Sequence, residues 1–180
     1  MLFSFDDCIR RYDSQYHIEK MIRADKLYKI SRGVYSDKKR VSELEVVAFK
    51  YPNAVFTMDS AFYYHGLTDV IPDLFHLATD RNAAKICSPS IKQLFYQDTL
   101  FPIGITSLSY QSSVIRIYDK ERMLIELIRK RDTLPFDYYK EIIHSYRRLT
   151  YELDIEKLQD YILHFPKKTH IMNAIQLEVL

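Results

Sequence analysis

Three side chains near the start of the chain have types and spacing suited to contacts with a polyanion. Tyr16, Lys20 and Arg23 stand at i, i+4 and i+7, positions that share one side of an α-helix. Lys29 and Arg32 follow shortly afterwards. Ammonium and guanidinium groups bond phosphate oxygens, and a tyrosine hydroxyl adds a further donor, so this pattern predicts contacts with nucleic acid.

The charge distribution points to the same region. Eight of the 21 residues from Lys20 to Arg40 are basic, and only Asp25 and Asp37 are acidic. Residues 1–40 carry ten basic and six acidic side chains, a net of +4, in a chain whose total is +2. The other 140 residues therefore sum to about −2. Such asymmetry is expected of a nucleic-acid-binding module attached to another unit.

Less specific readings of these residues stay open. The basic stripe formed by Tyr16, Lys20 and Arg23 could be a solvated face. Nearby acids would then dilute its charge, namely Asp13, Glu19 and Asp25. His17 could contact bases, although a surface histidine is the commoner role. Lys38 and Lys39 are included as candidate DNA contacts, but together with Arg40 they could also form a solvated joint between domains.

The elements that must position these side chains can be predicted. Ser4, followed by two acidic residues, is a helix N-cap signature for a short helix ending near Tyr12, and Ser14 can cap a second. In the second helix an apolar stripe lies opposite the basic one and consists of Ile18, Met21 and Ile22. Residues 27–30 and 34–36 then predict a β-hairpin whose turn contains Gly33. We therefore expect a reduced winged helix-turn-helix over residues 1–40.

Residues 41–180 predict an α+β domain with a mixed sheet and a helical C-terminus. Helices are expected over 41–50, from a cap at Asp59 or Ser60 up to Gly66, over 119–131, and after Pro135, Asp154 and Pro166. Strands are expected over 54–57, 74–78, 91–96, 103–106 and 114–118. No internal repeat or flexible linker interrupts this pattern.

A second charged constellation lies at the last strand-to-helix junction. It contains Arg116, Asp119 and Arg122, with Arg129 further along the helix. A helix N-terminus can bind phosphate, but Asp119 and Glu121 already occupy this one and would repel an anion. The alternative is that the acids cap the helix while Arg116 and Arg122 pair with acids of neighbouring elements.

Signatures of enzymes and metal sites are missing from the sequence. It has no ExK triplet for a metal-dependent nuclease, no Gly-Ser pair with DxD for a nucleotidyltransferase, no GxSxG, and no HxH or HExxH. We therefore expect no catalytic residues, no metal and no cofactor. The sequence also predicts a cytoplasmic protein without membrane contact. Its two cysteines are far apart, its first residues lack the features of a signal peptide, and it contains no long apolar run.

Three sequence blocks resemble those of a known family. Leu27-Tyr-Lys-Ile-Ser-Arg-Gly-Val-Tyr35 resembles the wing of AbiEi-type antitoxins of type IV toxin-antitoxin (abortive phage infection) systems, usually L-x-K-I-x-R-G-V-Y. Ser60-Ala61 with His65-Gly-Leu-Thr68 is similar to the S-A-L-x-x-H-G-L stretch of that family. Residues 116–131 look like its strand-and-helix block, with Glu126 where the family often has Asp.

The resemblance implies a winged helix-turn-helix that represses its own operon by binding inverted repeats in promoter DNA, with two protomers possible on the DNA. It further implies a C-terminal domain, here residues 41–180, that counteracts a nucleotidyltransferase toxin without a stable complex. Arg116, Asp119, Arg122 and Arg129 are the candidate residues of that domain. The competing hypothesis is a non-catalytic protein-interaction or ligand-binding module in which the reduced winged helix is a docking element.

Overall fold

The computed structural model describes residues 1–111 and 113–180. These form two compact units, Met1–Pro52 and Asn53–Leu180, which are treated separately below. The predicted domain limits, 1–40 and 41–180, stay a prediction. Among the described helices, none is long and apolar enough to cross a membrane.

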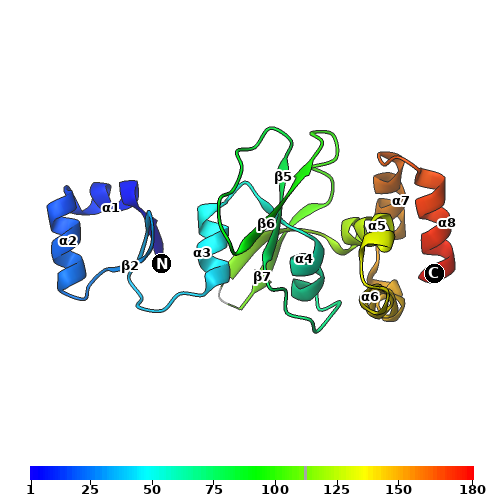
Figure 1. The fold of residues 1–180 in the computed structure, drawn as a ribbon, viewed down its shortest axis with the longest axis horizontal. Helices are drawn as coiled ribbons and strands as arrows, with labels where there is room; N and C mark the ends of the chain where they lie inside the picture. The colour runs from blue at the N-terminus through cyan, green and yellow to red at the C-terminus, as the bar shows by residue number, and fades with distance from the viewer. Residues whose placement is uncertain (112) are drawn as a thin grey trace. The chain divides into compact units, whose positions relative to one another are not determined.

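The N-terminal unit combines a small sheet with three helices (Figure 1). In chain order its elements are β1 (Leu2–Ser4), α1 (Phe5–Tyr12), α2 (Gln15–Arg23), β2 (Tyr28–Ser31), β3 (Val34–Ser36) and α3 (Glu43–Lys50). The three strands are antiparallel in the order β1-β3-β2. Helices α1 and α2 and the β2–β3 hairpin lie where the sequence predicts them, whereas β1 was not predicted.

Local hydrogen bonds explain where the first two helices begin. The Asp7 backbone N–H donates to Ser4 Oγ at 3.1 Å, and the Ser4 N–H donates to Asp7 Oδ2 at 3.0 Å, which forms a capping box. Asp13, with φ of 64°, ends α1 in the left-handed region. The His17 N–H then donates to Ser14 Oγ at 3.3 Å and starts α2. Both predicted caps are confirmed.

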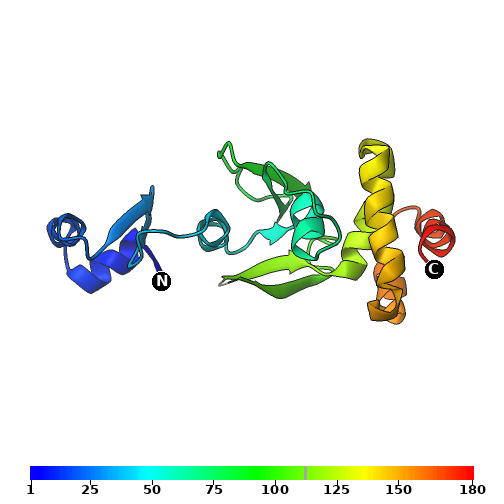
Figure 2. The same ribbon diagram turned by 90° about the horizontal axis from the view of Figure 1, so that it is seen from below.

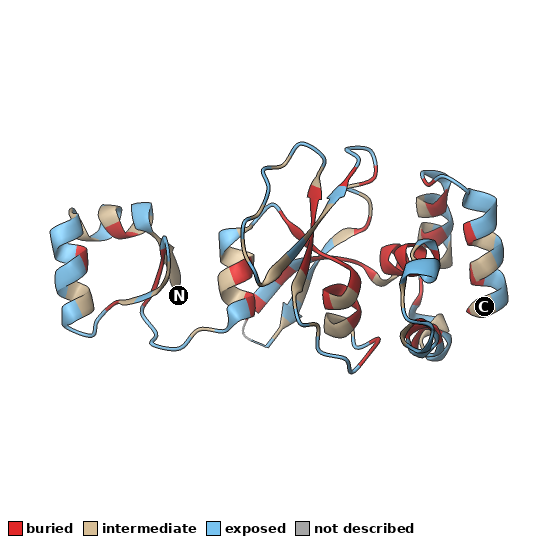
Figure 3. Ribbon diagram, viewed as in Figure 1, coloured by how far each residue is buried: buried red, intermediate tan, exposed pale blue. Residues whose placement is uncertain are grey.

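A small apolar cluster connects α1 and α2 to the three-stranded sheet, and Figure 3 shows the burial of residues along the chain. Its buried members come from four elements or their flanks and are Cys8, Ile18, Leu27 and Tyr35. Partly buried side chains pack around them, namely Phe3, Ile9, Tyr12, Met21 and Ile22. The apolar stripe predicted for α2 is therefore the face that docks.

The second unit is built on a five-stranded mixed sheet in the order β6-β5-β4-β8-β7. Its strands are β4 (Val55–Phe56), β5 (Phe75–Asp80), β6 (Ile91–Tyr96), β7 (Ile105–Tyr110) and β8 (Ser113–Tyr118). The pairs β4–β8 and β5–β6 are parallel, and the pairs β4–β5 and β7–β8 are antiparallel. This confirms the α+β class with a mixed sheet.

Helices follow the sheet toward the C-terminus (Figure 2). They are α5 (Lys120–Arg129), α6 (Phe136–Arg148), α7 (Ile155–Leu163) and α8 (Lys168–Glu178), with the short 3₁₀ turns η1 (Arg131–Thr133) and η2 (Thr150–Glu152). Every residue of α5 from Glu121 to Ile128 is buried. A helix buried on all sides is a core element, so α5 links the sheet to the helices packed on it.

Two predicted boundaries are wrong. The strand predicted over 103–106 lies at 105–110 instead, as β7, because its pairing with β8 continues to Tyr110↔Ser113.

The second wrong boundary is the start of a helix. The helix α4 (Met58–Tyr64) begins one or two residues before the predicted caps Asp59 and Ser60, and Thr57 occupies the N-cap position. Thr57 makes no side-chain cap bond there. Instead His76 Nδ1, on β5, accepts the Asp59 N–H at 3.3 Å. His76, which is distant in sequence, thus replaces the local cap. A local sequence pattern could not indicate this contact. The predicted end at Gly66, with φ of +67°, is confirmed.

Candidate nucleic-acid interface

The helix α2 separates its two kinds of side chain as the spacing predicts. Ile18 is buried on one side, while Lys20 and Arg23 are exposed and Tyr16 is 69% exposed. Arg23 approaches Glu19 at 3.8 Å, but both side chains are at least half exposed. Such a surface pair contributes little, so the guanidinium stays available to a stronger anion.

His17 is held at the beginning of α2. Its Nδ1 lies 3.1 Å from the carbonyl oxygen of Tyr12 and 3.1 Å from Ser14 Oγ. A carbonyl oxygen can only accept, so a bond to Tyr12 requires the proton on Nδ1 and leaves Nε2 as the acceptor of the neutral ring. The ring also meets Tyr16 edge-on, with centroids 5.6 Å apart. His17 and Tyr16 thus present an ordered aromatic pair beside the basic stripe.

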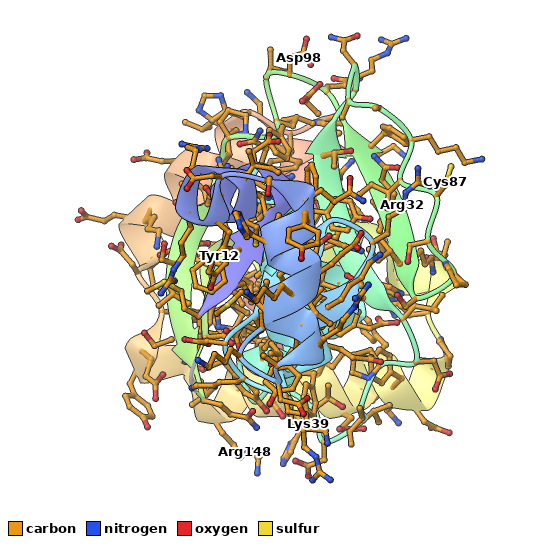
Figure 4. All side chains as sticks on the ribbon, turned by 90° about the vertical axis from the view of Figure 1, so that its left-hand side faces the viewer. Tyr12, Arg32, Lys39, Cys87, Asp98 and Arg148 are labelled. Atoms are coloured by element: carbon orange, nitrogen blue, oxygen red, sulfur yellow. The ribbon has the colours of Figure 1, made fainter. Side chains whose placement is uncertain are left out.

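The hairpin carries the next two candidate residues. Lys29 is exposed on β2, and Arg32 is exposed at the two-residue turn before β3. Gly33 completes this turn with φ of +76°, a conformation that glycine adopts without strain. In Figure 4, Arg32 and Tyr12 lie on opposite sides of α2, and Lys39 lies below both. The turn thus presents an exposed cation to solvent.

The segment after the hairpin remains strongly positive. Lys38, Lys39 and Arg40 are all exposed. The nearest acid, Asp37, accepts a hydrogen bond from the N-terminal ammonium group, and this bond lowers the pKa of the Asp37 carboxyl. Because that carboxylate is already paired, it neutralises the neighbouring lysines less. Lys26, between α2 and β2, is also exposed; it was missed as a candidate, although it belongs to the same basic stretch.

The second constellation has a different environment. The Arg122 side chain is fully buried and pairs with Glu126 at 2.8 Å, while its other terminal nitrogen donates to the Leu100 carbonyl at 2.9 Å. Its guanidinium carbon lies 4.8 Å from the Tyr118 ring and 4.4 Å from the Phe165 ring. The partner acid is therefore on the same helix, not on a neighbouring element as predicted. This geometry stabilises the core of the unit.

Asp119 and Glu121 hold the first part of α7 against α5. Asp119 caps α5 by accepting the Arg122 N–H at 2.8 Å, and it also accepts the Tyr161 hydroxyl at 3.0 Å. Lys157 Nζ lies 3.0 Å from both carboxylates. A buried, capped and paired N-terminus leaves little room for a phosphate. The cap role weighed for Asp119 is confirmed.

The remaining candidates of this constellation differ in access. Arg116, on β8, is exposed. Arg129 bonds both oxygens of Glu126 at 3.0 Å and lies 4.9 Å from the Phe165 ring centroid. Their predicted part in toxin neutralisation stays a prediction, and Arg116 is the member best placed to reach a partner.

The second and third sequence blocks meet in space. His65 Nε2, at the end of α4, lies 2.7 Å from the carbonyl oxygen of Tyr118, at the end of β8. Burial lowers the pKa of the His65 imidazole, which keeps it neutral as a donor. The bond between His65 and Tyr118 therefore gives both blocks a structural role.

The helical part of this unit also contains an open hollow of about 440 Å³. Its walls come from η1, one face of α6 and the end of α8. Three of its side chains are cationic, namely Arg131, Lys140 and Arg147, and His144 lies among them. The only acid there, Glu178, is bonded by Arg131 and by the Tyr139 hydroxyl.

No protein-family model matches this chain, and no curated protein matches it.

Proposed function

We propose that the protein is a DNA-binding autorepressor and the antitoxin of a type IV toxin-antitoxin operon. One observation carries the DNA-binding half. A strand, two helices and a hairpin form a unit with sheet order β1-β3-β2, and the exposed stripe of α2 and the exposed turn at Arg32 both carry cations. In winged helices the second helix of the helix-turn-helix enters the major groove. The wing would then meet phosphate.

The strand that was not predicted strengthens this proposal. Strand β1 pairs with β3 from Leu2↔Ser36 to Ser4↔Val34 and so fixes the hairpin to the start of α1. With it, the order of strand, two helices and hairpin agrees with that of a winged helix from its first strand onward, which supports the proposal. Tyr16, His17, Lys20 and Arg23 are assigned to the groove, and Lys29, Arg32, Lys38 and Lys39 to phosphates.

The antitoxin half is supported by the three family-like blocks in their order along the chain. The functional partner is a nucleotidyltransferase toxin, and the promoter of the shared operon is the DNA target. Neutralisation is expected without a stable complex between the two proteins, because the resemblance implies an antitoxin that counteracts the toxin without forming one.

Gel shifts with the promoter of the protein's own operon test the repressor half. We expect a shift with promoter DNA that weakens as salt rises, and none of comparable affinity with a scrambled sequence. Absence of a shift at low salt would refute it. Co-expression with the neighbouring toxin gene tests the other half, since failure to restore growth would contradict it.

The hollow on α6 favours a second candidate, a module that binds an anionic ligand. Its cations outnumber its one paired acid, so it would select anions by charge. Calorimetric titration with anionic small molecules distinguishes the two functions: binding there would be lost in Lys140→Glu but retained in Lys20→Glu. The reverse pattern is expected for promoter DNA.

A further inference from the structure

Strand β7 is an open sheet edge without the usual protection. It lies at the end of the five-stranded sheet and pairs with β8 without a break from Ile105↔Tyr118 to Tyr110↔Ser113. Its sequence, Ile-Thr-Ser-Leu-Ser-Tyr, contains no charged residue and no proline. Open edges of this kind recruit a further strand, and proteins normally block them with charges, proline, bulges or short strands.

The other edges of the two sheets do carry such protection. Strand β1 has only three residues. Strand β2 has an exposed Lys29 and a register shift between Lys29 and Ser31. Strand β6 has an exposed Lys92, and Gln93 holds a loop segment to it through bonds of 2.7 Å from the Ile86 N–H and 3.1 Å to the Ala84 carbonyl. Among the described edges, β7 is the exception.

The hydrogen-bond pattern shows which groups of β7 point outward. The Asp119 N–H donates to the Gly104 carbonyl at 2.7 Å, next to the Ile105↔Tyr118 pair. Hydrogen-bonded and non-bonded pairs alternate along an antiparallel ladder. Thr106, Leu108 and Tyr110 therefore bond β8. The N–H and C=O groups of the intervening residues, Ile105, Ser107 and Ser109, face the open edge.

These three positions are symmetric about Ser107. We propose that β7 pairs with β7 of a second copy of this chain, antiparallel and about a two-fold axis at Ser107. Ser107 then lies opposite Ser107 of the second copy, and Ile105 lies opposite Ser109. Both pairs bring together residues whose backbone N–H and C=O groups point outward. In this one register all of these outward groups therefore find hydrogen-bond partners.

The choice of a second copy over an unrelated strand rests on this self-complementarity and on the neutral edge. Leu108, half-buried at the edge, would come to lie opposite Thr106 of the second copy and lose exposed apolar surface. Six residues span only about 20 Å, so the contact is smaller than a standard interface. A weak dimer is therefore expected.

Sedimentation velocity of the full chain without DNA, over a range of concentrations, tests this pairing independently of the proposed function. Three variants probe the register. Ser107→Lys and Ser107→Glu each place like charges face to face on the two-fold axis, which disfavours the pair. Ser107→Pro removes only an outward N–H, which an edge strand tolerates. Ser107→Ala keeps every backbone group and is the matched control.

Wild type and Ser107→Ala should dimerise alike, whereas Ser107→Pro should stay monomeric with unchanged circular dichroism. Ser107→Lys should weaken dimerisation about fivefold. Arg116 lies opposite position 107 on β8 and adds to the positive charge there. An equal mixture of the Lys and Glu variants should dimerise again, because opposite charges then meet. A wild type that stays monomeric up to about 1 mM would overturn the proposal. So would a dimer indifferent to these changes, or a mixture that stays monomeric.

Discussion

Arg122 illustrates at the scale of one residue how a charged sequence block can serve the core. Its side chain is fully buried together with that of Glu126, and three aromatic rings surround it, those of Tyr96, Tyr118 and Phe165. Sequence spacing placed Arg122 and Glu126 one helical turn apart, but burial depends on contacts with distant segments. The functional reading of this block therefore depends most on Arg116.

Replacement of Arg122 by Met should strongly destabilise the protein. The change leaves the buried Glu126 with Arg129 as its remaining cation, and loss of one partner of a buried pair costs about 3 kcal/mol or more. Urea unfolding measures this loss. Arg148→Met, at an exposed position, is the control and should change stability by less than about 0.5 kcal/mol. Equal effects would refute the buried pair.

Glu121 should contribute stability that depends on pH. Burial alone would raise the pKa of its carboxyl, but bonds from the Asp154 N–H and Lys157 outweigh burial and lower it below 4.5. A lowered pKa gives stability that is present above about pH 4.5 and is lost as the pH falls further. Glu121→Gln should thus cost about 1–2 kcal/mol at pH 7.

Denaturant unfolding of wild type and Glu121→Gln at several pH values checks this expectation. The difference between the two proteins should shrink as the pH falls below 4.5. A difference that stays constant down to pH 3 would contradict the assigned shift.

At the scale of elements, local patterns predicted most helices and strands because their signals are local. Ser4, Ser14, Asp119 and Asp154 all cap helices by accepting a backbone N–H three residues later. Strand β1 was missed because its three residues become a strand only by pairing with β3, 30 to 34 residues away in the sequence. The position of β4 between β5 and β8 is equally non-local.

Two turn glycines should differ in their tolerance of a methyl group. Both have positive φ, +76° at Gly33 and +79° at Gly104. A Cβ at Gly33 would meet no atom within 4 Å, whereas one at Gly104 would lie 2.5 Å from Arg122 Cβ. Gly33→Ala should cost about 1 kcal/mol, and Gly104→Ala about 3 kcal/mol because overpacking adds to backbone strain. Thermal unfolding compares them, and equal losses would contradict the close approach.

At the scale of the whole molecule, the sequence indicated an uneven division of charge between a small basic unit and a larger one. The exposure of the candidate residues on α2 could be predicted because the apolar stripe of the same helix, with Ile18 buried, docks and leaves the opposite side to solvent. For the candidate residues of the second unit, exposure could not be predicted from the sequence in this way. Their accessibility depends on the packing of α5 among the sheet, α7 and α8, which determines whether an arginine faces solvent or core.

The most direct test of the central proposal is the salt dependence of promoter binding, measured by fluorescence anisotropy. Four to six phosphate contacts predict a slope of log K against log salt of about −4 to −5. Lys20→Glu with Arg23→Glu should weaken binding at least about tenfold and reduce the slope by about 2. Arg81→Glu with Lys85→Glu, the same charge change at exposed positions of the second unit, should bind like wild type. Equal weakening by both double variants, or none by either, would contradict an interface on α2.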